Sequence, residues 1–262
     1  MTATLPATSG ADTEALAEQL QQCGVVVLPE PFPADFVAEM REAFEALLEQ
    51  YLRRAEPNRG TLRHQMYLPF EPPFSDPALW ANLAVLAVVE RVLGPGFECT
   101  YYGSDTPFPG SDHQPVHQDG GPLFPEWDSR PPMYCVALNV PLVDVDEQNG
   151  PLEWFAGHDR PGPEAEPQRF TAPAGTVLLR DTRVWHRGSP NVGHGPRPML
   201  SLLYTRDWYR FVLPRPTIDR RVYERLPDPG SRLFRGADLT PTDRSTGDRP
   251  RLGPNAAGAP GS

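Results

Sequence analysis

His117-Gln118-Asp119-Gly120-Gly121 places an imidazole and a carboxylate two residues apart. Side chains alternate along an extended backbone, so residues i and i+2 project from the same side. The glycine pair that follows lets the backbone pass close to a bound group. This segment therefore predicts two adjacent metal ligands, His117 and Asp119.

A second imidazole comes from His186, which ends the segment Asp181-Thr182-Arg183-Val184-Trp185-His186 after an apolar strand. Two imidazole nitrogens and one carboxylate that leave the opposite face of the metal open are the ligands of non-haem Fe(II) oxygenases. We therefore predict that His117, Asp119 and His186 hold one iron ion.

Other histidines fit this pattern less well. His113 also has a neighbour at i+2, but that residue is Pro115, which cannot bind a metal. His158 and His194 lie in loops rich in glycine and proline, where solvated side chains are expected. His117 is therefore the preferred first ligand.

Charge and composition exclude several classes of protein. The net charge is −10, which argues against a nucleic-acid partner because phosphate binding needs a basic face. No apolar run reaches the roughly 18–20 residues of a membrane helix, and the N-terminus lacks the features of a signal peptide. We expect a cytoplasmic protein without membrane association, either a monomer or a homodimer.

Cysteine and lysine usage narrow the chemistry further. The three cysteines have no CxxC spacing and lie in apolar runs, which predicts buried thiols and no disulfide framework. The sequence contains no lysine, so all 24 basic residues are arginine. Lysine Schiff-base chemistry and a P-loop are excluded, and an anionic ligand must be held by arginine, backbone amides or hydroxyls.

The pattern of elements predicts an α+β fold. Amphipathic helices are expected at 13–23, 33–54 and 76–93, and short strands at 25–28, 97–104, 133–142, 151–155, 176–179 and 199–204. Helices followed by short strands favour a double-sheet jelly roll buttressed by N-terminal helices. We expect residues 1–10 to be disordered, 11–236 to form one domain, and 237–262 to be a flexible polar tail.

Two predicted strands offer polar side chains to a pocket. In the first, Thr100 and Tyr102 share one face. In the second, Asn139 lies with Cys135 and Ala137 on a face of small or polar residues, opposite a face of large apolar ones. The face of small and polar residues suits the lining of a pocket.

Arg197 is a candidate for binding a dicarboxylic co-substrate. It stands at the entrance to the strand 198–205, and a guanidinium beside an open metal position can bind the far carboxylate of a keto diacid through two hydrogen bonds. Alternation does not exclude three other arginines, Arg180, Arg183 and Arg187.

Four segments, at 117–120, 149–158, 174–191 and 197–204, occur in an order and spacing that resemble the phytanoyl-CoA dioxygenase family of Fe(II)/2-oxoglutarate oxygenases. The resemblance covers roughly residues 24–206. It implies a double-stranded β-helix (cupin-like) core and the cofactors Fe(II), 2-oxoglutarate and O2. It also implies iron on His117, Asp119 and His186, with Arg197 on the far carboxylate of 2-oxoglutarate.

The resemblance also suggests further contacts to the co-substrate. Family members use a hydroxyl just after the distal histidine, often two positions on, but that position is Gly188 here and the nearest hydroxyl is Ser189. Thr100, Tyr102 and Asn139 complete the predicted set. Several members also place a lysine near the co-substrate, and this chain has none. Because related halogenases lack the carboxylate ligand, Asp119 favours hydroxylation, desaturation or ring closure.

The sequence says less about the substrate. Segments 64–69, 107–127 and 207–215 are expected to form the pocket lid, with His64, Phe124, Trp127 and Trp208 as pocket residues. The composition fits a bacterial enzyme of specialised metabolism that oxidises a small molecule such as an antibiotic or a sugar-containing natural product. A non-catalytic cupin-like binding protein is the alternative, and a zinc hydrolase would have no use for Arg197.

Overall fold

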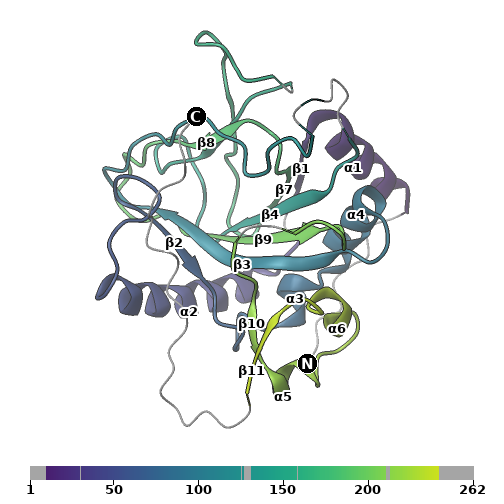
Figure 1. Ribbon diagram of the computed structural model, residues 1–262. Coiled ribbons are helices and arrows are strands. Elements are labelled where there is room, and N and C mark those ends of the chain that lie inside the picture. The colour runs from purple at the N-terminus through teal and green to yellow at the C-terminus, as the bar shows by residue number, and fades with distance from the viewer. Residues whose placement is uncertain are drawn as a thin grey trace.

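The computed structural model describes residues 10–29, 31–124, 126, 131–157, 159–210 and 213–241 (Figure 1). The helices are α1 (Gly10–Cys23), α2 (Ala34–Leu52), α3 (Pro77–Trp80), α4 (Leu83–Leu93), α5 (Arg220–Tyr223) and α6 (Gly230–Leu233). The longer strands are β1 (Val25–Leu28), β2 (Arg63–Tyr67), β3 (Glu98–Pro107), β4 (Cys135–Pro141), β7 (Val177–Asp181) and β9 (Met199–Thr205). The shorter strands are β5 (Leu152–Trp154), β6 (Gln168–Arg169), β8 (His186–Gly188), β10 (Thr217–Asp219) and β11 (Asp238–Thr240).

Two antiparallel sheets form the core. The larger has the order β1-β7-β4-β9-β3-β2 and the smaller the order β6-β5-β8. In Figure 1 the larger sheet lies between α2 on one side and β8 on the other. The predicted α+β fold with a double-stranded β-helix core is confirmed.

The helices bury an apolar stripe against the outer face of the larger sheet. In α2 the stripe consists of Met40, Phe44 and Leu48, which recur at helical spacing and are buried in the main core. The helix expected over 76–93 is in fact two, α3 and α4. The side chain of Asn82 accepts hydrogen bonds from the backbone N–H groups of Ala84 and Val85, which starts a new helix at that point.

The two faces of β4 were predicted correctly. Val136, Leu138 and Val140 lie in the main core against the helices, whereas Cys135 and Ala137 belong to a smaller cluster on the inner face. Large apolar side chains therefore face the helices, and small ones leave room between the sheets.

The predicted faces of β3 were wrong. A β-bulge interrupts the register between Cys99 and Tyr101, so Thr100 sits at the irregularity. Tyr102 lies in the main core and donates a hydrogen bond to the carbonyl of Phe74, which places it on the helix side. Tyr101 lies on the inner face instead. Because β3 is buried on both faces, its polarity pattern does not reveal which face is which.

The folded part of the chain extends beyond the predicted boundary at residue 236. β11 pairs in parallel with β10 and follows the buried side chains of Leu233 and Phe234. The remainder of the predicted tail from residue 242, and the N-terminal residues 1–9, lie outside the described residues. Within the described residues, no helix has the length and apolarity needed to cross a membrane.

Glu153 fixes the smaller sheet through charge. Its carboxylate is fully buried in β5, where it accepts hydrogen bonds from Arg169 in β6 at 2.9 Å and from Arg187 in β8 at 2.6 Å. Burial raises the pKa of Glu153, but these two arginines lower it more, so that it lies below the usual value. One buried anion thus joins the three strands, including the strand that begins at His186.

We predict that Glu153→Gln destabilises the fold by about 2 kcal/mol, because two arginines lose their buried partner. Glu147→Gln is the matched control: Glu147 also pairs with Arg169 but is exposed, so its loss should cost less than about 0.5 kcal/mol. Urea unfolding at neutral pH measures both.

The same pair of variants has a defined pH dependence. A carboxyl group with a lowered folded-state pKa contributes stability above its unfolded-state pKa, about 4.3, and loses that contribution as the pH falls through the folded-state value. The difference between wild type and Glu153→Gln should therefore shrink below about pH 4. A difference that is constant from neutral to acid pH would contradict the role of the charge.

Candidate metal centre

His117 and His186 face each other across a two-residue antiparallel bridge. The N–H of each donates to the carbonyl of the other at 2.9 Å, and the ring centroids are 4.3 Å apart. Gln114 extends this pairing, because its backbone N–H donates to Gly188 at 3.0 Å and its side chain accepts from the Gly188 N–H at 2.9 Å. The segment before Asp119 is thus held beside β8 by backbone and side-chain hydrogen bonds.

Asp119 completes a three-ligand group. One of its carboxylate oxygens lies 3.6 Å from His117 Nε2 and the other lies 3.4 Å from His186 Nε2. The ligand atoms of the three residues all lie within 4.8 Å of one another. The prediction that His117, Asp119 and His186 meet is confirmed.

Both imidazole rings are oriented by backbone carbonyls. Nδ1 of His117 lies 2.8 Å from the carbonyl of Pro115, and Nδ1 of His186 lies 3.0 Å from that of Val184. A carbonyl can only accept, so it favours the tautomer that has its proton on Nδ1 and a lone pair on Nε2. Each ring therefore directs its Nε2 at the space beside Asp119, where its lone pair could bind a metal.

Arg180, in β7, sets the charge balance of the site. Its Nη2 donates to Asp119 Oδ2 at 2.5 Å, and its Nη1 lies 3.3 Å from His186 Nδ1. Burial and Arg180 together lower the pKa of His186 to about 3, so the ring is neutral near pH 7. Burial raises the pKa of Asp119, but His186, Arg180 and His117 lower it more, and the group stays ionised.

Two of the competing arginines are engaged elsewhere. Arg183 forms a two-pronged pair with Asp181 and lies over the ring of Tyr134, while Arg187 pairs with Glu153. Arg197 differs from them. It is buried, its Nη2 donates to the carbonyl of Gly150 at 2.7 Å, and its Nε and Nη1 have no hydrogen-bond partner in the described part of the chain.

Two more predicted co-substrate contacts lie at different places. Asn139 is on the inner face, where its amide donates to the Ser201 hydroxyl at 3.3 Å and its carbonyl oxygen lacks a hydrogen-bond partner among the described residues. The Ser189 hydroxyl donates to the carbonyl of Pro151 at 2.7 Å. Position 188 shares a face with His186, and the Ser189 hydroxyl is already bonded to Pro151, so its contact with the co-substrate stays a prediction.

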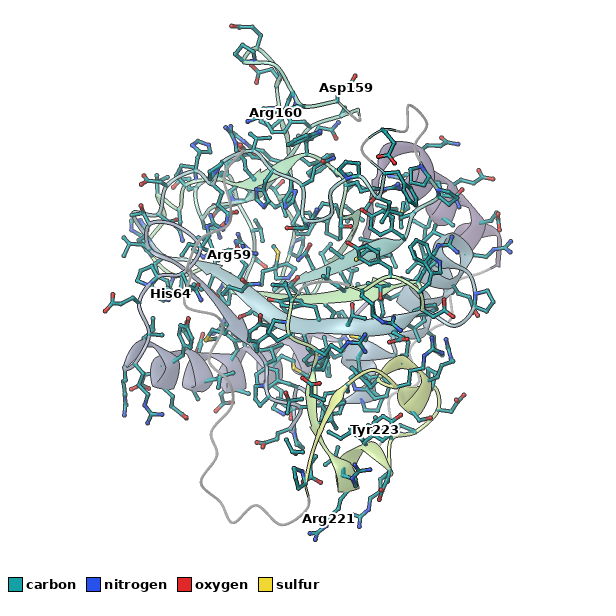
Figure 2. The ribbon with its side chains drawn as sticks, in the orientation of Figure 1. Arg59, His64, Asp159, Arg160, Arg221 and Tyr223 are labelled. Carbon is teal, nitrogen blue, oxygen red and sulfur yellow. The ribbon has the colours of Figure 1, made fainter. Side chains whose placement is uncertain are left out.

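The structure describes three of the four predicted pocket residues, His64, Phe124 and Trp208. His64 is not in a lid: it lies in β2, on the side of the sheet toward α2, between the rings of Tyr51 and Phe108 (Figure 2). Trp208 is exposed, with its ring centroid 6.4 Å from that of Tyr134, and Phe124 is also exposed. Trp127 lies outside the described residues.

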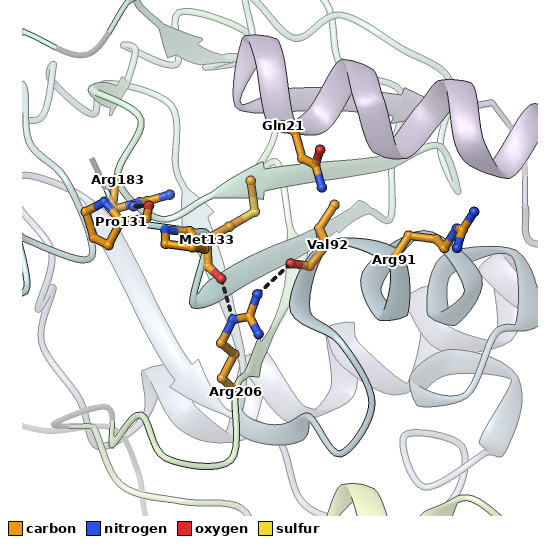
Figure 3. A pocket seen from close by; sticks show the side chains of 8 residues that line it. Gln21, Arg91, Val92, Pro131, Met133, Arg183 and Arg206 are labelled. Carbon is orange, nitrogen blue, oxygen red and sulfur yellow. Dashed lines mark hydrogen bonds between the residues drawn. The ribbon is translucent and has the colours of Figure 1, made fainter. Parts of the chain in front are cut away.

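A cavity of about 480 Å³ opens elsewhere, between α1, α4 and the segment that enters β4 (Figure 3). None of the three ligand residues lines it. Its arginines are already paired: Arg91 with Glu14, Arg183 with Asp181, and Arg206 with the carbonyls of Met133 and Val92. The chemistry therefore belongs to the metal-ligand group.

Most of the chain matches one known protein family. The model of the phytanoyl-CoA dioxygenase (PhyH) family matches residues 20–199, a range that includes all three ligand residues and Arg197. The chain belongs to the phytanoyl-CoA dioxygenase family.

Solved structures share the fold of this family member. The non-heme alpha ketoglutarate dependent epimerase SnoN from nogalamycin biosynthesis has 22% sequence identity and a TM-score of 0.58, with 75% of this chain and 83% of SnoN covered. HygX from Streptomyces hygroscopicus, solved with nickel and 2-oxoglutarate bound, has 18% identity and a TM-score of 0.60, covering 79% and 90%. AviO1 from Streptomyces viridochromogenes Tue57 has 20% identity and a TM-score of 0.58, covering 82% and 100%.

Sequence reasoning did not predict β2, a strand of this phytanoyl-CoA dioxygenase family fold beside the site. β2 places Arg63 opposite Pro107 and Gln65 opposite Asp105, on the same face as Tyr101, whose hydroxyl accepts from Gln65. The sequence feature that could have revealed this strand is the alternation of polar residues with His64, Met66 and Leu68 over 63–68. The alternation is weak because His64 is itself polar, so both faces of β2 carry polar groups.

We predict that Gly120→Val weakens divalent-metal binding about tenfold, as expected when the support of a ligand is displaced. A β-carbon at Gly120 would lie 2.7 Å from Thr182 Oγ1 and 3.1 Å from the Tyr134 hydroxyl, so either these side chains or the backbone beside Asp119 must move. Gly121→Val is the matched control, because the space around its β-carbon is open. Titration with Co(II) compares the variants, and equal affinities would contradict this role of Gly120.

Proposed function

We propose that this protein is an Fe(II)/2-oxoglutarate-dependent dioxygenase that oxidises a small molecule. One observation carries the proposal: the two-histidine, one-carboxylate group lies in the same barrel as Arg197, a buried arginine with unpartnered nitrogens. A metal-binding protein without turnover would not need such an arginine, and neither would a zinc hydrolase.

The donor set fits ferrous iron. Two neutral imidazole nitrogens and one carboxylate on one side of the metal are the facial arrangement of non-haem iron oxygenases. Among the described residues, no fourth histidine, cysteine or acidic ligand belongs to the group, so the opposite positions are left for co-substrate and O2. When bound, iron and 2-oxoglutarate supply an oxidation of the substrate that is coupled to decarboxylation of 2-oxoglutarate to succinate.

The protein's own residues bind and orient these groups. Arg180 holds one oxygen of Asp119, which fixes the carboxylate beside both Nε2 atoms. Arg197 is placed to bind the far carboxylate of 2-oxoglutarate by a charge-assisted hydrogen bond. Asn139 and Ser201 offer an amide and a hydroxyl from the inner face as further contacts. Burial of Arg197 strengthens its attraction for an anion and excludes competing water.

The side chains of the inner face suggest the class of substrate. Tyr101, Tyr134 and Leu203 are buried there, with Tyr67, Leu123 and Tyr209 packed against them. Aromatic walls suit a ligand with flat apolar faces, whether a polycyclic ring or the face of a sugar. SnoN has been solved in complex with nogalamycin RO, and HygX with hygromycin B. We infer that this chain acts on a natural product of comparable kind.

Asp119 also restricts the reaction. Because a carboxylate occupies the third ligand position, we infer hydroxylation, epimerisation, desaturation or ring closure in place of halogenation.

With ferrous iron, O2 and 2-oxoglutarate we expect wild-type protein to release succinate, and His186→Ala to release it only at the rate measured without protein. His194→Ala, which removes an exposed histidine in a loop, should behave as wild type. Succinate is quantified directly, and a natural-product library scored by stimulated O2 consumption then narrows the substrate. Metal-dependent binding of 2-oxoglutarate without succinate release in the presence of that library would favour the binding-protein alternative.

A further inference from the structure

We propose that Arg63 is a second arginine for the far carboxylate of 2-oxoglutarate, acting beside Arg197. The inference rests on the proposed function and assigns a residue that the sequence motifs did not indicate. Its evidence is a cluster of three buried or half-buried charges, Arg63, Asp105 and Arg197, and the absence of a side chain at Gly188, whose place the Arg63 guanidinium takes.

Arg63 is a deeply buried cation. Only 1% of the residue is exposed. Its Nη1 donates to Asp105 Oδ2 at 2.7 Å and its Nη2 to the carbonyl of Ser189 at 3.0 Å, while its Nε is buried without a hydrogen-bond partner among the described residues. A buried cation is costly unless its donors are satisfied, so the free N–H indicates a missing acceptor.

The cluster has one positive charge too many. Asp105 Oδ2 lies 2.7 Å from Arg63 Nη1 and 4.0 Å from Arg197 Nη2, so two guanidinium groups share one carboxylate. Three of their nitrogens, Arg63 Nε and Arg197 Nε and Nη1, lack a hydrogen-bond partner in the described structure. One further carboxylate would balance both the charge and these donors, and the far carboxylate of 2-oxoglutarate is such a group.

Gly188 links Arg63 to the metal centre. A β-carbon at Gly188 would lie 2.5 Å from the guanidinium carbon of Arg63 and equally close to both terminal nitrogens. Gly188 follows His186 by two residues in β8, so both positions share a face and are separated by about 6.6 Å along the strand. That separation suits a five-carbon diacid with its keto-acid end on the metal. Position 188 must lack a side chain because the Arg63 guanidinium fills that space.

The test measures binding and does not require turnover. Mn(II) replaces iron, and calorimetric titration gives the affinity for 2-oxoglutarate and for oxalate, which binds a metal but has no far carboxylate. We expect Arg63→Gln to weaken 2-oxoglutarate binding about 10- to 100-fold, the value of one charged hydrogen bond. Oxalate affinity should stay within about twofold of wild type, which also shows that the variant is folded around its metal.

If Arg63→Gln does not fold, Gly188→Ala keeps the proposal testable because it leaves Arg63 in place. The new methyl group collides with the Arg63 guanidinium, so 2-oxoglutarate binding should weaken while oxalate affinity stays close to that of wild type. An unchanged 2-oxoglutarate affinity in Gly188→Ala would contradict the role of Arg63. Arg53→Gln, which removes an exposed arginine at the end of α2, is the control and should bind as wild type.

The outcomes separate the two proposals. If Arg197→Gln loses 2-oxoglutarate affinity and Arg63→Gln does not, the role of Arg63 is overturned while the proposed function stands. Equal losses for 2-oxoglutarate and oxalate would make Arg63 a purely structural residue and also overturn its role. If wild-type protein with Mn(II) binds oxalate but not 2-oxoglutarate, the proposed function itself fails.

Discussion

The metal site depends on the backbone pairing of His117 with His186. Their two mutual hydrogen bonds bring residues from distant parts of the chain to opposite positions, and the geometry of a non-sequential strand pair then fixes both side chains on one face. Alternation carries Asp119 to the same face, and Arg180 holds its carboxylate there. Glu153 secures the strand that His186 begins, so a buried ion pair outside the site maintains the distance between its ligands.

Close packing around small residues lets the buried charges fit into the barrel. A side chain at Gly120 would meet Thr182 and Tyr134 next to Asp119, and Gly188 leaves room for the Arg63 guanidinium two residues after His186. The site needs glycine at both positions, because other side chains already occupy the space that a β-carbon would take. These are Thr182 and Tyr134 at Gly120, and the charged Arg63 at Gly188.

The ligand residues could be predicted from the sequence because their signal is local: a two-residue spacing, and a histidine that ends an apolar strand. The inner face of β4 could be predicted for the same reason, since small and large side chains alternate there. Tyr102 could not be placed, because β3 is buried on both faces and a bulge at Thr100 shifts its register. The environment of Arg63 was also hidden from sequence, because it depends on Gly188 and Asp105, which only the folded chain brings near.

The chain has no lysine, and the buried cations of the barrel are arginines. Arg63, Arg180 and Arg197 are each at most 3% exposed. Burial can lower the pKa of a lysine by several units from about 10.4. A buried lysine can therefore lose its positive charge near neutral pH. Burial lowers the pKa of Arg197 only to about 10, with Arg63 adding to the effect and Asp105 opposing it, so the group stays charged. Guanidinium groups therefore allow an acidic protein to keep a permanently cationic interior, and such an interior is suited to a dianionic co-substrate.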